Sequence, residues 1–320
     1  DGSAFSWFDH LQSIGFINEN NELINDTLPP KMTKINEKVF FHCEVITTID
    51  VNNVIELKPY CFQYCFHLTS LKLRKVEIIG EFSLFSTNLS EVIEFPSTLK
   101  EIHDHAFVSS YVTEITGEVP NLKIINGAFN ECSELKHIPK LTGIVRIENF
   151  AFAGCYKLKE VHCGPNLTSI SYSCFNGCGE LVSFTTESKN YTIAERAFCV
   201  CSSLPTFNFE GVTEILDNAF EACYSFVEID MSNSHLEEVL PIFQDCVNLT
   251  SIVLPQNLTN FDLKSFEECN IQSFTFSGTK GTLNLKGTFY QSQIDLCEVI
   301  FSPSCNVIMD STFASCYQLS

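Results

Sequence analysis

Hydrophobic positions recur along this chain with a period close to 23 residues. Each period contains one phenylalanine, and successive members of the series are separated by 22 to 24 residues. The series is Phe40, Phe62, Phe85, Phe107, Phe129, Phe152, Phe175, Phe198, Phe220, Phe243, Phe266, Phe289 and Phe313. A unit of this length is too small to bury its own apolar face, so consecutive units must stack and cover one another. The periodicity therefore predicts a solenoid.

The neighbours of each phenylalanine repeat as well, and the unit reads A-F-x-x-C-x-x-L-x-x-I-x-L, as in residues 151–163. The L-x-x-I-x-L part alternates inward and outward positions, which predicts short strands paired in a parallel sheet on the concave side. The A-F-x-x-C part is too short for a standard helix, so turns, short strands and 3₁₀ segments are expected on the convex side. The expected fold is a β-dominated repeat of the α/β type, a right-handed leucine-rich-repeat solenoid of about thirteen rungs of 22–24 residues.

The two ends of the chain differ from the repeat. Residues 1–34 are expected to form an N-terminal cap and half-repeat, because Phe5, Phe8 and Leu11 have the spacing of a short amphipathic helix or strand. Residues 35–320 are the predicted leucine-rich-repeat array, and the last repeat is incomplete. Since an open rung exposes apolar surface and an unpaired strand edge, we expect the C-terminal edge to be continued or covered by a partner.

Composition and charge narrow the range of partners. Of the 320 residues, 45% are hydrophobic and 18% are charged, which is enough for a substantial core. The formal net charge of −20 repels phosphate backbones and anionic lipid surfaces, so no nucleic acid partner is expected. The sequence also lacks the run of about 18 apolar residues that a membrane helix requires, so no membrane insertion is expected.

The sixteen cysteines could indicate disulfides or a metal site. Ten of them share one column, three residues after the repeated phenylalanine: Cys43, Cys65, Cys132, Cys155, Cys178, Cys201, Cys223, Cys246, Cys269 and Cys316. Equivalent side chains in stacked rungs point in parallel, which is unsuitable for disulfides, so we expect small buried hydrophobic residues here. The other six form no matched pairs at zinc spacing, and no metal site is expected.

Catalytic signatures are absent from the sequence. The clustered His103 and His105 fit a solvated loop, and there is no nucleophile elbow, phosphate loop or Ser-His-Asp order. We therefore expect a protein that is not an enzyme and has no catalytic residue and no cofactor. Asn-x-Ser/Thr sequons occur at Asn25, Asn88, Asn166, Asn190, Asn248 and Asn257. Three of them are Asn-Leu-Thr in a recurring element of the repeat, so they are weak evidence for secretion.

The A-F-x-x-C-x-x-L-x-x-I-x-L unit, often followed by proline, resembles the BspA-like, treponemal-type leucine-rich repeat family. The resemblance extends over about thirteen units, and ten of these carry cysteine three residues after the phenylalanine. It implies a surface protein of the kind found in anaerobic bacteria and anaerobic protists, several of which are implicated in adhesion to host proteins. The family has no catalytic residues.

Solenoids bind through extended faces, so the outward positions of the predicted strands are the candidate site. We call twelve of these outward positions the predicted binding face: Asp50, Lys72, Glu94, Glu114, Thr116, His137, Glu160, His162, Thr185, Asn208, Glu228 and Asp230. This set is polar, rich in hydroxyl groups and mildly acidic, which favours protein recognition over a deep ligand pocket. The alternative is a solvated sheet surface with no partner.

Two functional hypotheses remain open from the sequence. The first is a non-enzymatic protein–protein interaction module of the BspA-like adhesion type, located at the cell surface or outside the cell. The second is an intracellular scaffold or structural subunit of a large assembly, for example a cytoskeletal one, located in the cytoplasm. The many thiols and the incomplete last rung favour the second hypothesis.

Overall fold

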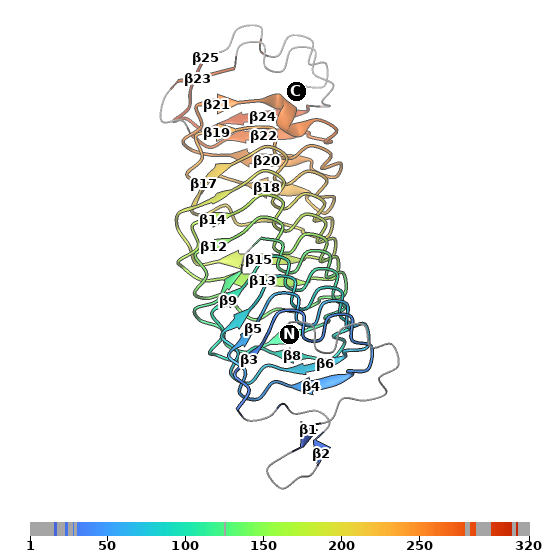
Figure 1. Cartoon of the computed structure of the whole chain (residues 1–320). Coiled ribbons are helices and arrows are strands. Elements are labelled where there is room, and N and C mark those ends of the chain that lie inside the picture. Colours follow the sequence, from blue (N-terminus) through green and yellow to red (C-terminus); the bar gives the residue numbers. More distant parts are fainter. Residues whose placement is uncertain are drawn as a thin grey trace. The chain divides into compact units, whose positions relative to one another are not determined.

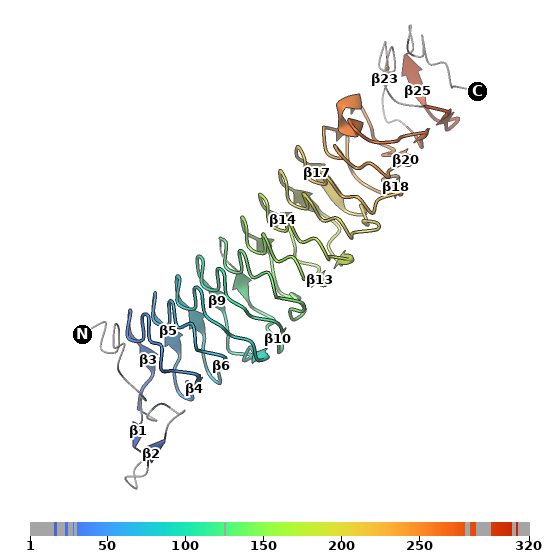
Figure 2. The ribbon, with the colours of Figure 1, turned by 90° about the vertical axis from the view of Figure 1, so that its right-hand side faces the viewer.

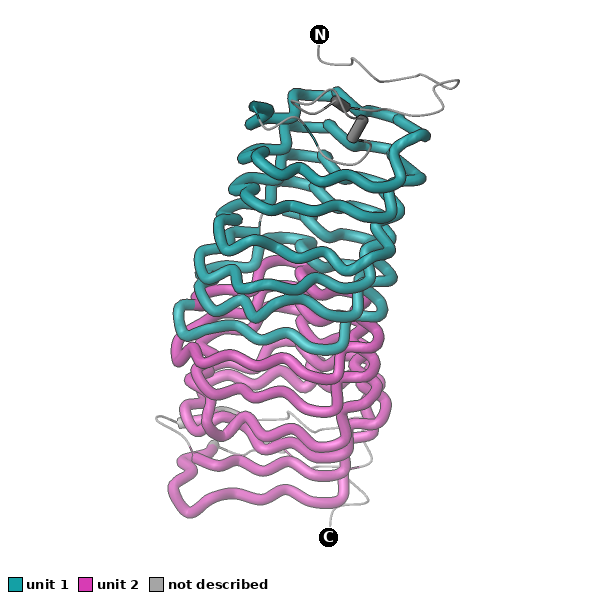
Figure 3. Tube along the Cα trace, turned by 90° about the horizontal axis from the view of Figure 1, so that it is seen from below, with its two compact units in different colours: residues 1–166 teal, residues 167–320 magenta. Residues whose placement is uncertain are grey.

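The computed structural model describes residues 16–17, 23–24, 28, 31–124, 126–278, 282–285, 296–308 and 312. The chain divides into two compact units, residues 1–166 and residues 167–320, which Figure 3 shows in separate colours. The described residues form about eleven turns, where the sequence predicted thirteen. The difference arises because the turns of Phe289 and Phe313 lie outside the described residues, as do the expected cap residues Phe5, Phe8 and Leu11.

The first unit contains two series of short strands on opposite sides of its turns (Figures 1 and 2). The first series is β4 (Thr48–Asp50), β6 (Ser70–Lys72), β8 (Ile93–Glu94), β10 (Ile115–Thr116) and β13 (Glu160–Cys163). The second series is β3 (Lys34–Ile35), β5 (Glu56–Leu57), β7 (Ile78–Ile79), β9 (Glu101–Ile102), β11 (Lys123–Ile124) and β12 (Arg146–Ile147). Pairing is parallel between β4 and β6, between β8 and β10, and along β3-β5-β7-β9-β11. Before these strands, β1 (Phe16–Ile17) and β2 (Leu23–Ile24) form an antiparallel pair.

The second unit repeats this arrangement. Its first series is β15 (Ser183–Thr186), β18 (Glu228–Asp230), β20 (Ser251–Leu254), β22 (Ser273–Phe276) and β24 (Glu298–Phe301). Its second series is β14 (Ser169–Ile170), β16 (Tyr191–Ile193), β17 (Val212–Ile215), β19 (Glu238–Val239), β21 (Asn260–Phe261), β23 (Thr282–Asn284) and β25 (Asn306–Ile308). The β18-β20-β22-β24 sheet is parallel throughout, and the 3₁₀ helix η1 (Leu263–Phe266) is the one helical segment among the described residues. The predicted parallel-sheet solenoid is confirmed.

Stacked phenylalanine rings fill the core of each unit. In the first unit Phe129 lies between Phe107 and Phe152, with ring centroids 4.8 and 5.3 Å apart. In the second unit the rings of Phe198 and Phe220 are 5.3 Å apart and within 2° of parallel. The backbone supports the stack, because in most rungs the ladder N–H donates to a carbonyl of the next rung, as Phe107 N–H does to Ala128 O at 2.8 Å. We call this series the phenylalanine ladder.

The sequence-derived spacing placed Phe85 in the ladder, and this assignment is wrong. Leu84 occupies the ladder position and is fully buried, whereas Phe85 is half-buried. The backbone decides the register, since Leu84 N–H donates to Ala106 O in the same pattern that the phenylalanines follow. A second sequence-based expectation is confirmed: the inward positions of one unit, Phe152, Cys155, Leu158 and Val161, are all buried.

The repeat cysteines contribute both packing and hydrogen bonds. Cys132 Sγ donates to Phe107 O at 2.9 Å, and Cys223 Sγ donates to Phe198 O at 3.3 Å, so each thiol contacts the ladder carbonyl one rung earlier. Where the column carries Ser110, its hydroxyl donates to the carbonyl of Leu84 in the same way. None of the fifteen described cysteines forms a disulfide, and the described members of the repeat column are buried apart from Cys269, which is half-buried.

The turns around the ladder use left-handed backbone without glycine at most positions. In most of the described rungs, the residue two before and the residue two after the ladder position have φ between 50° and 76°, as Lys38 and His42 do at 57° and 55°. Bulky side chains seldom adopt this region, and a β-branched one such as Val200, with φ of 60°, is strained there. The left-handed conformation lets the chain reverse direction tightly while its amides still bond to the next rung.

Replacement of Val200 by glycine is therefore expected to raise the free energy of unfolding by about 0.5–1 kcal/mol. Relief of left-handed strain is worth about 1–2 kcal/mol, and it exceeds the entropic cost of glycine. Val182→Gly is the matched control, because Val182 is similarly exposed (45% against 41%) but has no left-handed backbone. Chemical denaturation should show that the control loses stability. An equal loss of stability in both variants would contradict the claim that the backbone at Val200 is strained.

Candidate functional site

The strands of the first series position the predicted binding face. In the first unit, register brings Asp50 opposite Lys72, Glu94 opposite Thr116, and Glu114 opposite His137. In the second unit, Glu228 and Asp230 lie side by side with Ser251 and Val253 of the next strand. The exposed members of the predicted set are Lys72, Glu94, His137, Glu160, Thr185, Asn208, Glu228 and Asp230, and the half-buried ones are Glu114, Thr116 and His162.

Asp50 differs from the other members because it is buried. Its carboxylate accepts hydrogen bonds from Arg74, with Nε–Oδ2 and Nη2–Oδ2 distances of 3.1 and 2.8 Å. The hydrogen bonds and then the charge of Asp50 raise the pKa of the Arg74 guanidinium. A carboxylate held in this two-pronged contact is already paired. Asp50 therefore fixes Arg74 to the surface rather than presenting a free charge.

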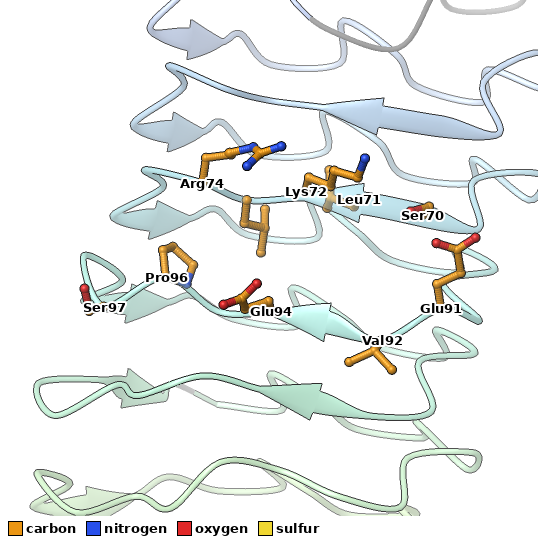
Figure 4. A pocket seen from close by; sticks show the side chains of 10 residues that line it. Ser70, Leu71, Lys72, Arg74, Glu91, Val92, Glu94, Pro96 and Ser97 are labelled. Atoms are coloured by element: carbon orange, nitrogen blue, oxygen red, sulfur yellow. The ribbon is translucent and has the colours of Figure 1, made fainter.

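A hollow of about 580 Å³ lies between β6 and β8 on this face (Figure 4). Lys72 and Arg74 come from the rung of β6, while Glu91, Val92 and Glu94 come from the rung of β8. Lys72, Glu91 and Glu94 form no hydrogen bond or ion pair through their side chains within the described part of the chain. The hollow thus combines a lysine and two glutamates, none of them in an ion pair with another described residue, with Val92, which is 56% exposed.

The second series of strands has a different character in the first unit. Its outward charges are paired across rungs, as in Lys34–Glu56 at 3.7 Å and Lys100–Glu77 at 2.6 Å. Exposed pairs of this kind contribute about 0–1 kcal/mol each to stability. Because their charges are already satisfied, this side of the first unit offers fewer free groups to a partner than the hollow does.

Arg74, Glu91 and Val92 are members of the hollow that the predicted set did not contain. Arg74 follows Ser70 and Lys72 at two-residue spacing, so the strand alternation, extended by one more outward position, would have found it. Glu91 lies two residues before β8, at the repeat position of Thr69, to whose carbonyl its N–H donates at 3.2 Å; this position lies outside the strand positions that the predicted set was taken from.

The described residues hold no group of three or more His, Cys, Asp or Glu side chains arranged to bind a metal ion. In the same residues, no helix is long and apolar enough to span a bilayer. Small-molecule sites are typically deep and enclosed, whereas this hollow is open, and four of its ten lining residues are charged. Such a surface is suited to contact with another macromolecule.

The repeat units match the family model described as the BspA type leucine rich repeat region, in six copies over residues 3–116, 122–239 and 241–320. The chain belongs to this family. The match covers nearly all of the sequence, including both units and both strand series. Membership in this family is consistent with a protein-interaction module. No curated protein sequence matches the chain.

Solved structures similar to this chain are leucine-rich repeat proteins of bacteria. One is a leucine-rich repeat protein from Bacteroides ovatus, 20% identical over 97% of this chain and 98% of the other, with a TM-score of 0.45. A leucine rich cell surface protein from Faecalibacterium prausnitzii is 19% identical over 96% of each chain, with a TM-score of 0.41. The leucine-rich repeat protein of T. pallidum is 22% identical over 55% of this chain and 72% of its own, with a TM-score of 0.36.

Proposed function

We propose that this chain is a non-enzymatic protein-binding module that serves adhesion at a cell surface or outside the cell, and that it contacts its partner through the predicted binding face. The observation that carries the proposal is the hollow between β6 and β8, where Lys72 and Glu94 are exposed and form no ion pair with any other described residue. Unpaired charges around the apolar Val92 select a partner by charge complementarity, and burial of Val92 adds affinity. Membership in the BspA-type family supports the adhesive role.

Charge reversal at Lys72 tests this proposal. The binding partners are the immobilised extracellular-matrix proteins that the unaltered chain binds. Lys72→Glu is expected to lower the affinity for them about tenfold or more, because it places a third carboxylate in the hollow. Lys75→Glu is the matched control: it makes the same change in net charge, but Lys75 lies outside the hollow, where its Nζ donates to Asn53 Oδ1 at 2.9 Å. Surface plasmon resonance on a panel of purified matrix proteins provides the measurement.

Two outcomes would contradict the proposal. One is equal loss of affinity in the two variants, which would show that only the net charge matters. The other is the absence of binding to every matrix protein by the unaltered chain.

An intracellular scaffold is the second candidate, and the cysteines favour it. None of the fifteen described cysteines forms a disulfide, which is usual in reducing compartments. Glycosylation distinguishes the two candidates, because sequons such as Asn248 have exposed side chains. The protein is isolated from its native cells and treated with an enzyme that removes N-linked glycans. A shift in electrophoretic mobility supports the cell-surface adhesion module. An unglycosylated protein in the cytosolic fraction supports the intracellular scaffold.

A further inference from the structure

Aromatic side chains gather on the turns of the second to fourth rungs, away from the predicted binding face. We call these six residues the aromatic turn patch: Tyr60, Tyr64, Phe66, Phe82, Phe85 and His105. Phe66 is 46% exposed and the other five are half-buried. Tyr60, Phe82 and His105 form a stack, with ring centroids 5.5 and 4.9 Å apart.

Edge-to-face and tilted contacts connect the stack to the remaining rings. Phe85 lies 5.7 Å from Phe82 and 5.3 Å from Tyr64, at interplanar angles of 64° and 89°. Tyr64 in turn lies 5.8 Å from Phe66. Rings that meet at such angles do not cover one another's faces as completely as stacked rings do. The patch is therefore continuous over three rungs and keeps part of its π surface accessible.

The fold does not require aromatic residues at these positions. The turn position of Phe82 is occupied by Gly127 and Ser173 in other rungs, and the position of Tyr64 is occupied by Gly154 and Gly177. Phe82 and Tyr64 have φ of 50° and 62°, a region that is unfavourable for bulky side chains. The aromatic residues are thus present at positions where the backbone favours small ones, which points to a role in binding.

The charges around the patch indicate which ligand chemistry suits it. Lys38 Nζ lies 5.3 Å from the centroid of the Tyr60 ring, so a cation of the chain itself already rests on one ring. The Tyr60 hydroxyl donates to Glu81 Oε1 at 3.4 Å. Partial desolvation and then the negative charge of Glu81 raise the pKa of Tyr60. Together with a net charge of −20, these groups favour a cationic ligand.

We propose that the aromatic turn patch is a second binding surface, one that takes arginine side chains of a basic protein segment. The guanidinium group stacks on aromatic faces and pairs with carboxylates, so it uses both the rings and Glu81. The segment runs along the turns, across successive rungs, and contacts rings of neighbouring rungs together. This surface is distinct from the hollow between β6 and β8 and does not depend on the adhesive role.

The test compares two double variants that change no charge. In Tyr64→Gly/Phe82→Gly, two rings of the patch are replaced by the residue that other rungs carry at the same turn positions. Phe150→Gly/Val200→Gly is the matched control, because Phe150 and Val200 have the same two turn positions and left-handed φ (55° and 60°) outside the patch. The probe is a fluorescent hexa-arginine peptide, titrated into the full chain and followed by anisotropy at physiological salt.

We expect the patch variant to bind the peptide about tenfold more weakly than the unaltered chain, since two cation–π contacts are lost, and the control to remain within about twofold. Thermal denaturation of both variants verifies that each remains folded. Equal affinity of all three proteins would overturn the proposal, because the peptide would then be held by net charge alone. Loss of binding to a neutral hexasaccharide, with arginine binding unchanged, would also overturn it and assign the patch to sugars.

Discussion

Replacement of Phe198 by alanine is expected to lower the free energy of unfolding by about 3–5 kcal/mol. Phe198 lies in the phenylalanine ladder of the second unit, fully buried, with its ring 5.2 Å from Phe175 and 5.3 Å from Phe220. Phe184 and Phe207 contact it edge to face, each at 5.2 Å. Truncation removes these contacts and opens a cavity that the neighbouring rungs cannot fill, because their backbones are held by hydrogen bonds from rung to rung.

Tyr224→Ala provides the control for this prediction. Tyr224 is an aromatic residue of a neighbouring rung in the same unit, but its side chain is 44% exposed. Its removal is expected to change stability by less than about 0.5 kcal/mol, as for most surface substitutions. Urea denaturation of the two variants makes the comparison. Similar losses would show that the ladder does not carry the stability of the unit.

The repeat made the architecture predictable, because period, strand alternation and the buried column are all local patterns. The ladder register at Leu84 was not predictable from spacing. Phe85 lies 23 residues after Phe62 and 22 before Phe107, whereas Leu84 lies 22 after and 23 before, so the repeat interval admits both positions. The left-handed backbone at Phe82 and Ser86 determines the register of this rung, because it places Leu84 inward. Since neither residue is glycine, sequence rules for turns gave no indication of it.

The candidate site was predictable to a smaller extent. Strand alternation correctly placed Lys72 and Glu94 outward, because both lie within strands. It also placed Asp50 outward, but the contact with Arg74, 24 positions later, holds that carboxylate against the surface. Contacts between rungs depend on side-chain reach as well as on register, and a single rung contains no information on them. The aromatic turn patch was missed for a related reason, since its rings approach one another only when rungs stack.

Stability is expected to fall steeply as the pH rises above about 9, because the folded chain keeps many thiols protonated. Burial is the main cause that raises the pKa of these thiols: Cys43, Cys61, Cys65, Cys132, Cys163, Cys199, Cys201, Cys223 and Cys305. For Cys163, which is fully buried, burial raises the pKa to about 12. Below pH 9 this thiol is protonated in both the folded and the unfolded chain, so its contribution to stability is complete and independent of pH.

Above pH 9 the unfolded chain releases the Cys163 proton while the folded chain retains it. The folded state then binds more protons, and stability decreases by about 1.4 kcal/mol per pH unit for this thiol until the pH approaches 12. Cys163→Ala should lower stability at pH 7.5, because it creates a small cavity, and should flatten the alkaline slope by that amount. Cys297→Ala, at an exposed thiol, should leave the slope unchanged. Denaturation curves at pH 7.5, 9.0 and 10.0 measure all three slopes, and an unchanged slope in Cys163→Ala would show that this thiol ionises equally in both states.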